Sequence, residues 1–221
     1  MTAKTSYLTS TIGQKQVVAL SGLSLSLFVL AHMMGNLLIF VSPQAYNMYG
    51  HALVSTPLIY VAEAGLVLFF ALHVFLAIRL TWLNRGARPQ AYAVSAKGEK
   101  ATHFVQKTLL AQGLVILVFV ILHLITFKYG KVYWVTYDGV TVRDLHRLII
   151  EVFSQPGYLT WYLVALVVLG LHLSHGVSSA LQTFGAAHPQ LTPLLKKIGL
   201  GYALIVSLGF ISLPIYVYFI Y

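Results

Sequence analysis

Five long apolar stretches constrain the fold of this 221-residue chain more than any other feature. Hydrophobic residues make up 58% of the sequence and charged residues only 9%, against about 25% charged in soluble domains. A hydrocarbon core about 30 Å thick needs roughly 20 apolar helical residues to span it. The sequence therefore predicts one all-α domain, residues 1–221, built as an integral membrane bundle of five transmembrane helices. The predicted spans are residues 17–41, 58–83, 108–127, 158–184 and 198–221.

The net charge of +9 comes from Lys and Arg residues that fall almost wholly between the apolar stretches. This placement is typical of membrane topology signals, so no nucleic-acid partner is expected. Counting basic residues by side gives ten against four, which predicts a cytoplasmic amino terminus and an outer carboxyl terminus. The ten are Lys4, Lys15, Arg79, Arg85, Arg88, Lys97, Lys100, Lys107, Lys196 and Lys197, and the four are Lys128, Lys131, Arg143 and Arg147.

The predicted outer loop, residues 128–157, is long enough to hold structure of its own. Within it, residues 140–153 carry apolar side chains at helical spacing with charged residues between them. This pattern predicts a short amphipathic helix on the outer surface. This helix either seals the end of the bundle or contributes to a ligand site, and the sequence does not decide between the two. The segments 42–56 and 84–103 are expected to be connections.

Four histidines, His32, His73, His123 and His172, each lie inside a different predicted span. His32 and His123 come 15 and 16 residues after the inner ends of outward-running helices, roughly 22 to 24 Å deep at about 1.5 Å per residue. His73 and His172 come 15 and 14 residues after the outer ends of inward-running helices, hence about 7 to 9 Å from the inner edge. The depths therefore predict two pairs, His32 with His123 and His73 with His172.

A histidine in lipid is a candidate functional residue, although a single one can also serve as an interhelical hydrogen-bond partner. Without cysteine, the chain has no thiolate metal site and no attachment for c-type haem. Two histidines alone make a poor site for a bare metal, whereas haem supplies four nitrogens and needs only axial ligands. The pairs therefore predict two bis-histidine haems b that carry electrons. His175, one turn beyond His172, is a rival ligand.

Several short motifs resemble the dihaem cytochrome b subunit of succinate:quinone oxidoreductases, the group that includes menaquinol:fumarate reductases. They are Ser21-Gly22-Leu23 followed by Phe28 and His32-Met33, then Leu72-His73-Val74-Phe75 through Arg79, then His172-Leu173-Ser174-His175-Gly176. The similarity covers all five predicted helices. The resemblance implies that the first and third helix histidines hold a distal haem and that the second and fourth hold a proximal haem. It also selects His172 over His175.

The resemblance further implies a bacterial cytoplasmic-membrane complex in which a flavoprotein subunit and an iron–sulfur subunit dock on the cytoplasmic face. Electrons would pass between menaquinone or menaquinol near the distal haem and the iron–sulfur partner, and the dicarboxylate active site would lie on a partner subunit. The basic residues between the second and third spans either form that docking surface or serve topology alone. Dimerisation of the complex and the direction of catalysis, succinate oxidation or fumarate reduction, stay open.

Glu63 is the only acidic residue inside a predicted span, five residues into the second. It is expected to exchange protons with menaquinol, with a structural hydrogen bond at the membrane border as the alternative. Some related fumarate reductases carry a glutamate two residues before the fourth-helix ligand, where this chain has Gly170. Transmembrane proton transfer by that route is therefore in doubt here.

Two other functions fit part of the pattern. A cytochrome b subunit of a membrane hydrogenase or formate dehydrogenase would also join quinone to an iron–sulfur partner. A haem-free transporter or proton channel could use histidines to shuttle protons, but the paired depths and the few carboxylates argue against it.

Overall fold

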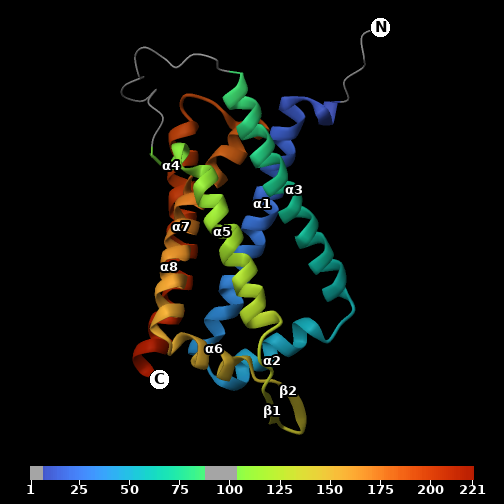
Figure 1. Ribbon diagram of the computed structural model, residues 1–221, viewed down its shortest axis with the longest axis vertical. Helices are drawn as coiled ribbons and strands as arrows, with labels where there is room; N and C mark the ends of the chain where they lie inside the picture. The colour runs from blue at the N-terminus through green and yellow to red at the C-terminus, as the bar shows by residue number, and fades with distance from the viewer. Residues whose placement is uncertain (1–6, 88–103) are drawn as a thin grey trace.

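The computed structural model describes residues 7–87 and 104–221. Within these ranges, five helices are long and apolar enough to cross a membrane, which confirms the five predicted spans. The helices cover Thr11–Phe40, Leu58–Gly86, Leu109–Lys128, Pro156–Ala186 and Thr192–Ile220. Figure 1 shows them running alternately up and down, with the carboxyl terminus at the end opposite the start of the first helix.

Three of the five spans end in a helical turn of different pitch. The α-helical parts are α1 (Thr11–Asn36), α3 (Leu58–Gly86), α5 (Leu109–His123), α7 (Pro156–Leu181) and α8 (Thr192–Ile220). A 3₁₀ turn, η2 (Leu37–Phe40), continues α1, and π-helical turns η4 (Leu124–Lys128) and η5 (Gln182–Ala186) continue α5 and α7. The short elements η1 (Tyr7–Thr9) and α4 (Phe104–Lys107) precede α1 and α5.

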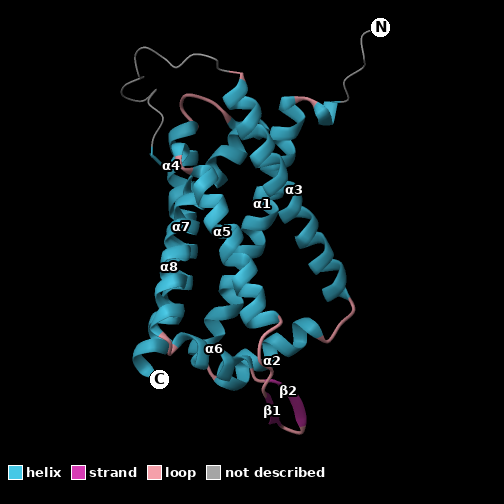
Figure 2. Ribbon diagram, viewed as in Figure 1, coloured by secondary structure: helices cyan, strands magenta, loops and turns pink. Residues whose placement is uncertain are grey.

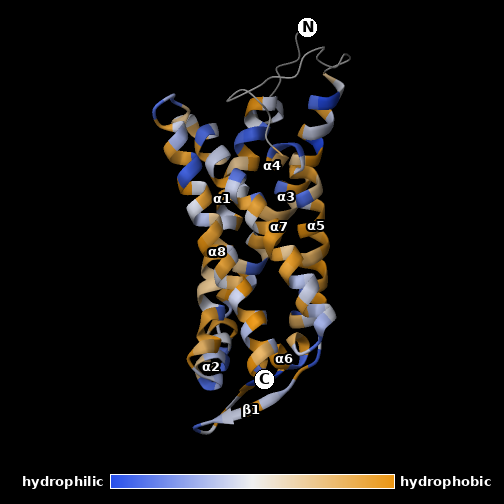
Figure 3. Ribbon diagram, turned by 90° about the vertical axis from the view of Figure 1, so that its left-hand side faces the viewer, coloured by the Kyte–Doolittle hydropathy of each residue, from blue (hydrophilic) through white to orange (hydrophobic). Residues whose placement is uncertain are grey.

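Large apolar side chains cover the outside of the spans. Leu27, Phe75 and Ile205, for example, are each more than 60% exposed. Figure 3 shows hydrophobic residues along the middle of the helices and hydrophilic residues gathered toward their ends. Apolar surface on this scale matches a hydrocarbon solvent, because in water it would favour association with other apolar surfaces.

The helices form an uneven bundle. α7 and α8 pack along most of their length, α1 packs on α3 and α7, and α5 packs on α7. Small residues allow the closest approach: a Cβ on Gly199 of α8 would lie only 2.8 Å from the Ser174 carbonyl oxygen of α7. α3 makes its main contact with α1, and Figure 1 shows its first turns leaning away from the other helices.

A cap of shorter elements closes one end of the bundle (Figure 2). It contains α2 (Pro43–Val54), α6 (Leu145–Phe153) and an antiparallel hairpin of β1 (Trp134–Tyr137) and β2 (Val140–Arg143). A buried apolar cluster joins this cap to the spans, with Ile39, Tyr46, Leu148, Phe153, Tyr162 and Val217 among its members.

The prediction that residues 42–56 are only a connection was wrong, because most of the segment is α2. Its start is well specified: the Ser42 hydroxyl accepts a hydrogen bond from the Ala45 amide at 3.0 Å, and Pro43 occupies the first helical position. The segment is too short and too polar to span a membrane, so it lies across the end of the bundle (Figure 1).

The amphipathic helix expected at 140–153 is shorter than predicted. Residues Val140–Arg143 belong to strand β2, and only Leu145–Phe153 is helical. Asp138 and Gly139 have φ angles of 51° and 82°, the conformation of a tight two-residue hairpin turn, and so fold β2 back on β1. Asp144 then starts α6 by accepting a hydrogen bond from the Arg147 amide at 3.0 Å.

Several residues used in the sequence analysis lie outside the described residues. These are Lys4, Arg88, Lys97 and Lys100.

Candidate functional site

The structure brings His73 of α3 and His172 of α7 together. Their ring centres lie 6.3 Å apart with planes at 77°. The Nδ1 atom of His73 lies 3.2 Å from the Val18 carbonyl oxygen and 3.3 Å from the Ser21 hydroxyl, both on α1. A carbonyl oxygen only accepts hydrogen bonds, so Nδ1 of a neutral His73 carries the proton and Nε2 keeps a free lone pair. We call this the inner pair, after the depth predicted for it from the sequence.

The second pair is formed by His32 of α1 and His123 of α5. Their ring centres are 5.9 Å apart, with planes at 87°. The Nδ1 atom of His123 lies 3.1 Å from the Tyr162 hydroxyl of α7. The His32 ring stacks on Phe28, 5.5 Å away and nearly parallel, and also contacts Phe210 of α8. We call this the outer pair.

A polar chain supports the outer pair from α2. The Tyr46 hydroxyl donates to the Asn36 side-chain oxygen at 2.9 Å, and the Asn36 amide nitrogen donates to the His32 carbonyl oxygen at 2.8 Å. Burial raises the pKa of Tyr46, so its hydroxyl stays protonated and remains a donor. This chain ties the capping helix α2 to the backbone of the residue that carries one histidine ring.

The two pairs lie at different levels of the bundle. The inner pair contacts α1 at Val18, Ser21 and Gly22, and His32 follows Gly22 by ten residues on the same helix. At about 1.5 Å per residue, the levels differ by about 15 Å along the helix axis.

Comparisons of the chain with protein-family models, with curated proteins and with solved structures gave no match.

The spacing within each pair suits two axial ligands of one metal. Because the bond between an imidazole nitrogen and a first-row metal is about 2 Å long, two such rings have centres about 6 Å apart. Among the described residues, no group of three or more His, Cys, Asp or Glu side chains lies close enough to hold a metal ion. Two imidazoles suit a metal whose remaining ligands come from a macrocycle, and in this respect the residues fit haem.

Two details of the inner pair add to this fit. Nδ1 of His172 is buried and has no hydrogen-bond partner among the described residues, an arrangement that leaves part of the ring unsatisfied. A Cβ on Gly22 would lie 3.0 Å from Cε1 of His73, so the ring occupies space that only glycine leaves free. Gly113 of α5 is less tight, with its Cβ position 4.0 Å from the His172 ring.

His175 is not the ring that pairs with His73. In the described part of the chain, the only histidine ring in contact with His73 is that of His172. Gly170, on the same helix, faces α8, where a Cβ would collide with the Ser207 hydroxyl. A glutamate at this position would therefore require the Ser207 side chain to move.

Glu63 lies on α3 beside the outer pair. A pocket of about 350 Å³ opens between α1 and α3, and its lining includes Glu63, Ser24, Phe28 and Phe69. Phe28 separates this pocket from the His32 ring on which it stacks. The Glu63 carboxylate forms an ion pair with Lys128, which ends the π-helical turn after α5. The pocket thus combines an apolar wall with one carboxylate.

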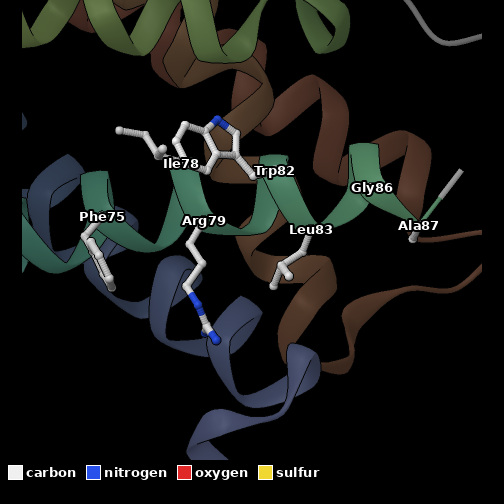
Figure 4. Close-up of a pocket in the computed structure, with 7 residues that line it drawn as sticks. All are labelled: Phe75, Ile78, Arg79, Trp82, Leu83, Gly86 and Ala87. Atoms are coloured by element: carbon white, nitrogen blue, oxygen red, sulfur yellow. The ribbon is translucent and has the colours of Figure 1, made fainter. Parts of the chain in front are cut away.

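A second groove, of about 720 Å³, runs along the outside of α3 near its end (Figure 4). Its lining is apolar apart from Arg79, and Figure 4 shows Arg79 pointing to the opposite side of the helix from Trp82. Both side chains are exposed. Arg79 is one of the residues assigned to the inner face from sequence, and its exposure leaves it accessible there.

Two residues near the outer pair were missed in the sequence analysis. Tyr162 contacts His123, and Lys128 pairs with Glu63. Tyr162 lies in a span that is apolar on most of its circumference, so the sequence pattern does not indicate which of its side chains faces α5. Lys128 was assigned to topology alone, although a cation at a span end within reach of an acidic residue could have suggested the ion pair.

Proposed function

We propose that this chain is the dihaem cytochrome b anchor of a succinate dehydrogenase or menaquinol:fumarate reductase complex. It would carry electrons between menaquinone or menaquinol near the outer pair and an iron–sulfur partner at the inner face. The observation that carries the proposal is the occurrence of two histidine pairs, each with ring centres about 6 Å apart, at two levels of one bundle. The flavoprotein subunit would hold the dicarboxylate site.

The four histidines would form two haem sites. His73 and His172 would hold the proximal haem, and His32 and His123 the distal haem. Haem, when bound, supplies an iron that changes oxidation state by one electron. With two imidazoles as its protein ligands, such an iron would keep no open site for oxygen, which favours electron transfer over oxygen chemistry. Val18, Ser21 and Tyr162 orient the rings by hydrogen bonds to Nδ1.

Glu63 would serve the quinone. Oxidation of menaquinol releases two protons with its two electrons, and a carboxylate at the pocket wall can accept a proton. The ion pair with Lys128 fixes where that carboxylate lies. The apolar lining and the size of the pocket suit a flat aromatic headgroup. The pocket adjoins Phe28, which places it next to the outer pair.

Single-ligand variants test the haem assignment. We expect His73→Ala and His123→Ala each to remove one of two b-type haem signals, and not the same one, in reduced-minus-oxidised spectra of the membrane-extracted complex. His175→Ala is the matched control, because it lies one turn from His172 on the same helix, and it should keep both signals. A chain with no b-type spectrum, or a His175 variant that loses the proximal haem, contradicts the proposal.

Glu63→Gln tests the quinone site. We expect menaquinol oxidation to fall by about 100-fold, a usual effect of removing a general base, while both haem signals persist. Glu151→Gln is the matched control, because Glu151 is also a carboxylate paired with a lysine, Lys131, but lies on α6 outside the pocket. Equal rates in the Glu63 variant and in the wild type would refute the assignment.

The hydrogenase and formate dehydrogenase alternative keeps the haems but changes the partner. Purification of the native complex decides between them, since the proposed complex contains a covalent-flavin subunit. Recovery of a hydrogenase or formate dehydrogenase subunit in its place would favour the alternative.

A further inference from the structure

The two histidine pairs differ in what holds the second nitrogen of their rings. In the inner pair, Nδ1 of His73 meets the backbone carbonyl of Val18 and the Ser21 hydroxyl. In the outer pair, Nδ1 of His123 meets a side chain, the hydroxyl of Tyr162, at 3.1 Å. One of the two inner contacts is therefore made by the backbone and survives substitution, whereas the outer contact depends on one phenol that a substitution can remove.

Tyr162 is held firmly in place. Its side chain is only 5% exposed, and its ring packs edge-on against Phe119 and Phe153, with ring centres 4.9 and 4.8 Å away. Phe127 adds a third edge-on contact at 6.1 Å. Within the described residues, Nδ1 of His123 is the hydrogen-bond partner of the Tyr162 hydroxyl. Such a cage fixes the hydroxyl beside the His123 ring and keeps water away from the contact.

A hydrogen bond at this position affects a metal bound through the other ring nitrogen. If Nε2 of His123 binds iron, Nδ1 carries the proton and donates it to the phenol oxygen. An acceptor at Nδ1 makes the imidazole a more basic ligand, which stabilises ferric over ferrous iron. The reduction potential falls as a consequence. The apolar surroundings strengthen the effect, because a hydrogen bond is electrostatically stronger where the local dielectric is low.

We propose that Tyr162 is a positioning residue that lowers the reduction potential of the distal haem by accepting a hydrogen bond from His123. This inference rests on the proposed function. In it, one side chain adjusts the reduction potential of one haem independently of the other haem in the same bundle. At the proximal haem the Ser21 hydroxyl also lies near Nδ1 of His73, at 3.3 Å, but the Val18 carbonyl at 3.2 Å remains whatever residue occupies position 18 or 21.

Redox titration of Tyr162→Phe in the purified complex tests the inference. Phenylalanine keeps the aromatic packing and removes only the hydroxyl. We expect the potential of the distal haem, identified as the one lost in His123→Ala, to shift upward, while that of the proximal haem is unchanged. The low-spin ferric electron paramagnetic resonance signal of the distal haem should change as well, since its g values respond to the ligand field of the two histidines.

Tyr202→Phe is the matched control. Tyr202 also has its hydroxyl bonded between helices, to the Ser26 carbonyl oxygen at 2.5 Å, but that bond involves none of the four haem-ligand candidates. It should leave both potentials unchanged. A second variant, with a fluorinated tyrosine inserted at position 162, weakens the phenol oxygen as an acceptor without removing it. It should shift the distal potential upward by less than Tyr162→Phe does.

The outcomes separate the two proposals. An unchanged distal potential in Tyr162→Phe, or an equal shift of both haems, overturns the inference while leaving the dihaem assignment intact. If Tyr162→Phe loses the distal haem, the fluorinated variant decides, since an unchanged potential there overturns the inference. Absence of haem from the wild-type complex would instead overturn the proposed function itself.

Discussion

The space around each histidine ring is set by the smallest residues near it. Gly22 of α1 illustrates this, because a Cβ there would approach Cε1 of His73 to 3.0 Å and Nδ1 to 3.4 Å. These contacts are tighter than ordinary van der Waals packing, so a larger side chain must move the ring or the helix. The hydrogen bonds from Nδ1 of His73 to Val18 and Ser21 would be disturbed by the same movement of the ring.

Gly22→Val should therefore reduce the content of the proximal haem and spare the distal one. We expect a loss of at least half of the proximal signal in reduced-minus-oxidised spectra, because the displaced ring no longer faces His172. Gly201→Val on α8 is a suitable comparison, since nothing lies within 4 Å of its Cβ position. Retention of both haems in the Gly22 variant would show that the ring is free to adapt.

At this scale, counting residues from the span ends paired His32 with His123 and His73 with His172, and the structure brings the rings of each pair together. Depth along a helix follows from the rise per residue alone. The rotation of a helix about its axis cannot be derived in this way, because an apolar residue can face either lipid or a neighbouring helix. Tyr162 and Lys128 depended on that rotation and were missed.

The shorter elements at one end of the bundle are held by a polar network around Asn47 of α2. Its side chain is 1% exposed and donates to the Tyr137 hydroxyl and the Asp144 carboxylate, while its oxygen accepts from the His146 amide. One buried amide thus links α2, β1 and the start of α6. The length of the predicted outer loop indicated that it holds structure. The network itself could not be predicted, because its partners are 90 or more residues apart in the sequence.

The burial of His146 leads us to expect that the docking of α6 depends on pH. Its side chain is buried beside the Tyr221 ring, and its Nε2 has no hydrogen-bond partner among the described residues. Burial lowers the pKa of His146, although the Asp144 carboxylate opposes the shift. The folded chain thus favours the neutral ring. The resulting stabilisation is complete above the unfolded pKa of about 6.5 and is lost as the pH falls below it.

We expect amide hydrogen exchange in α6 to accelerate as the pH is lowered from 7.5 to 5, after correction for the intrinsic pH dependence of exchange. Protonation of His146 opposes burial of α6 against α8. His146→Gln removes the titrating group, so its corrected exchange should be nearly constant over this range. An identical pH dependence in the variant and the wild type would assign the effect to another group.

The signals for α2 and the hairpin were present in the sequence. Ser42-Pro43 is a usual helix start, and Asp138-Gly139 is a usual hairpin turn. They were overlooked because hydropathy dominates a membrane sequence and leaves everything between the spans to be treated as loop. The helix predicted at 140–153 was too long for a related reason. In so short a segment the hydrophobic pattern fits both a strand and a helix, and only the preceding hairpin turn distinguishes them.

Over the whole molecule, the five spans form a frame in which α7 is central. It packs on α1, α5 and α8, carries His172 of the inner pair, and supplies Tyr162 to the outer pair ten residues earlier. A shift of α7 along its axis would therefore disturb both sites at once. The number of spans followed directly from composition, because hydrocarbon thickness fixes the length of apolar helix required.

We propose that this bundle holds two haems, one at each histidine pair. The most direct measurement is the ratio of haem b to polypeptide in the purified complex, combined with a redox titration of the same sample. The account predicts two haems per chain with two resolved reduction potentials, of which His123→Ala and His73→Ala each remove a different one. A ratio of one or none in the wild-type complex would contradict it.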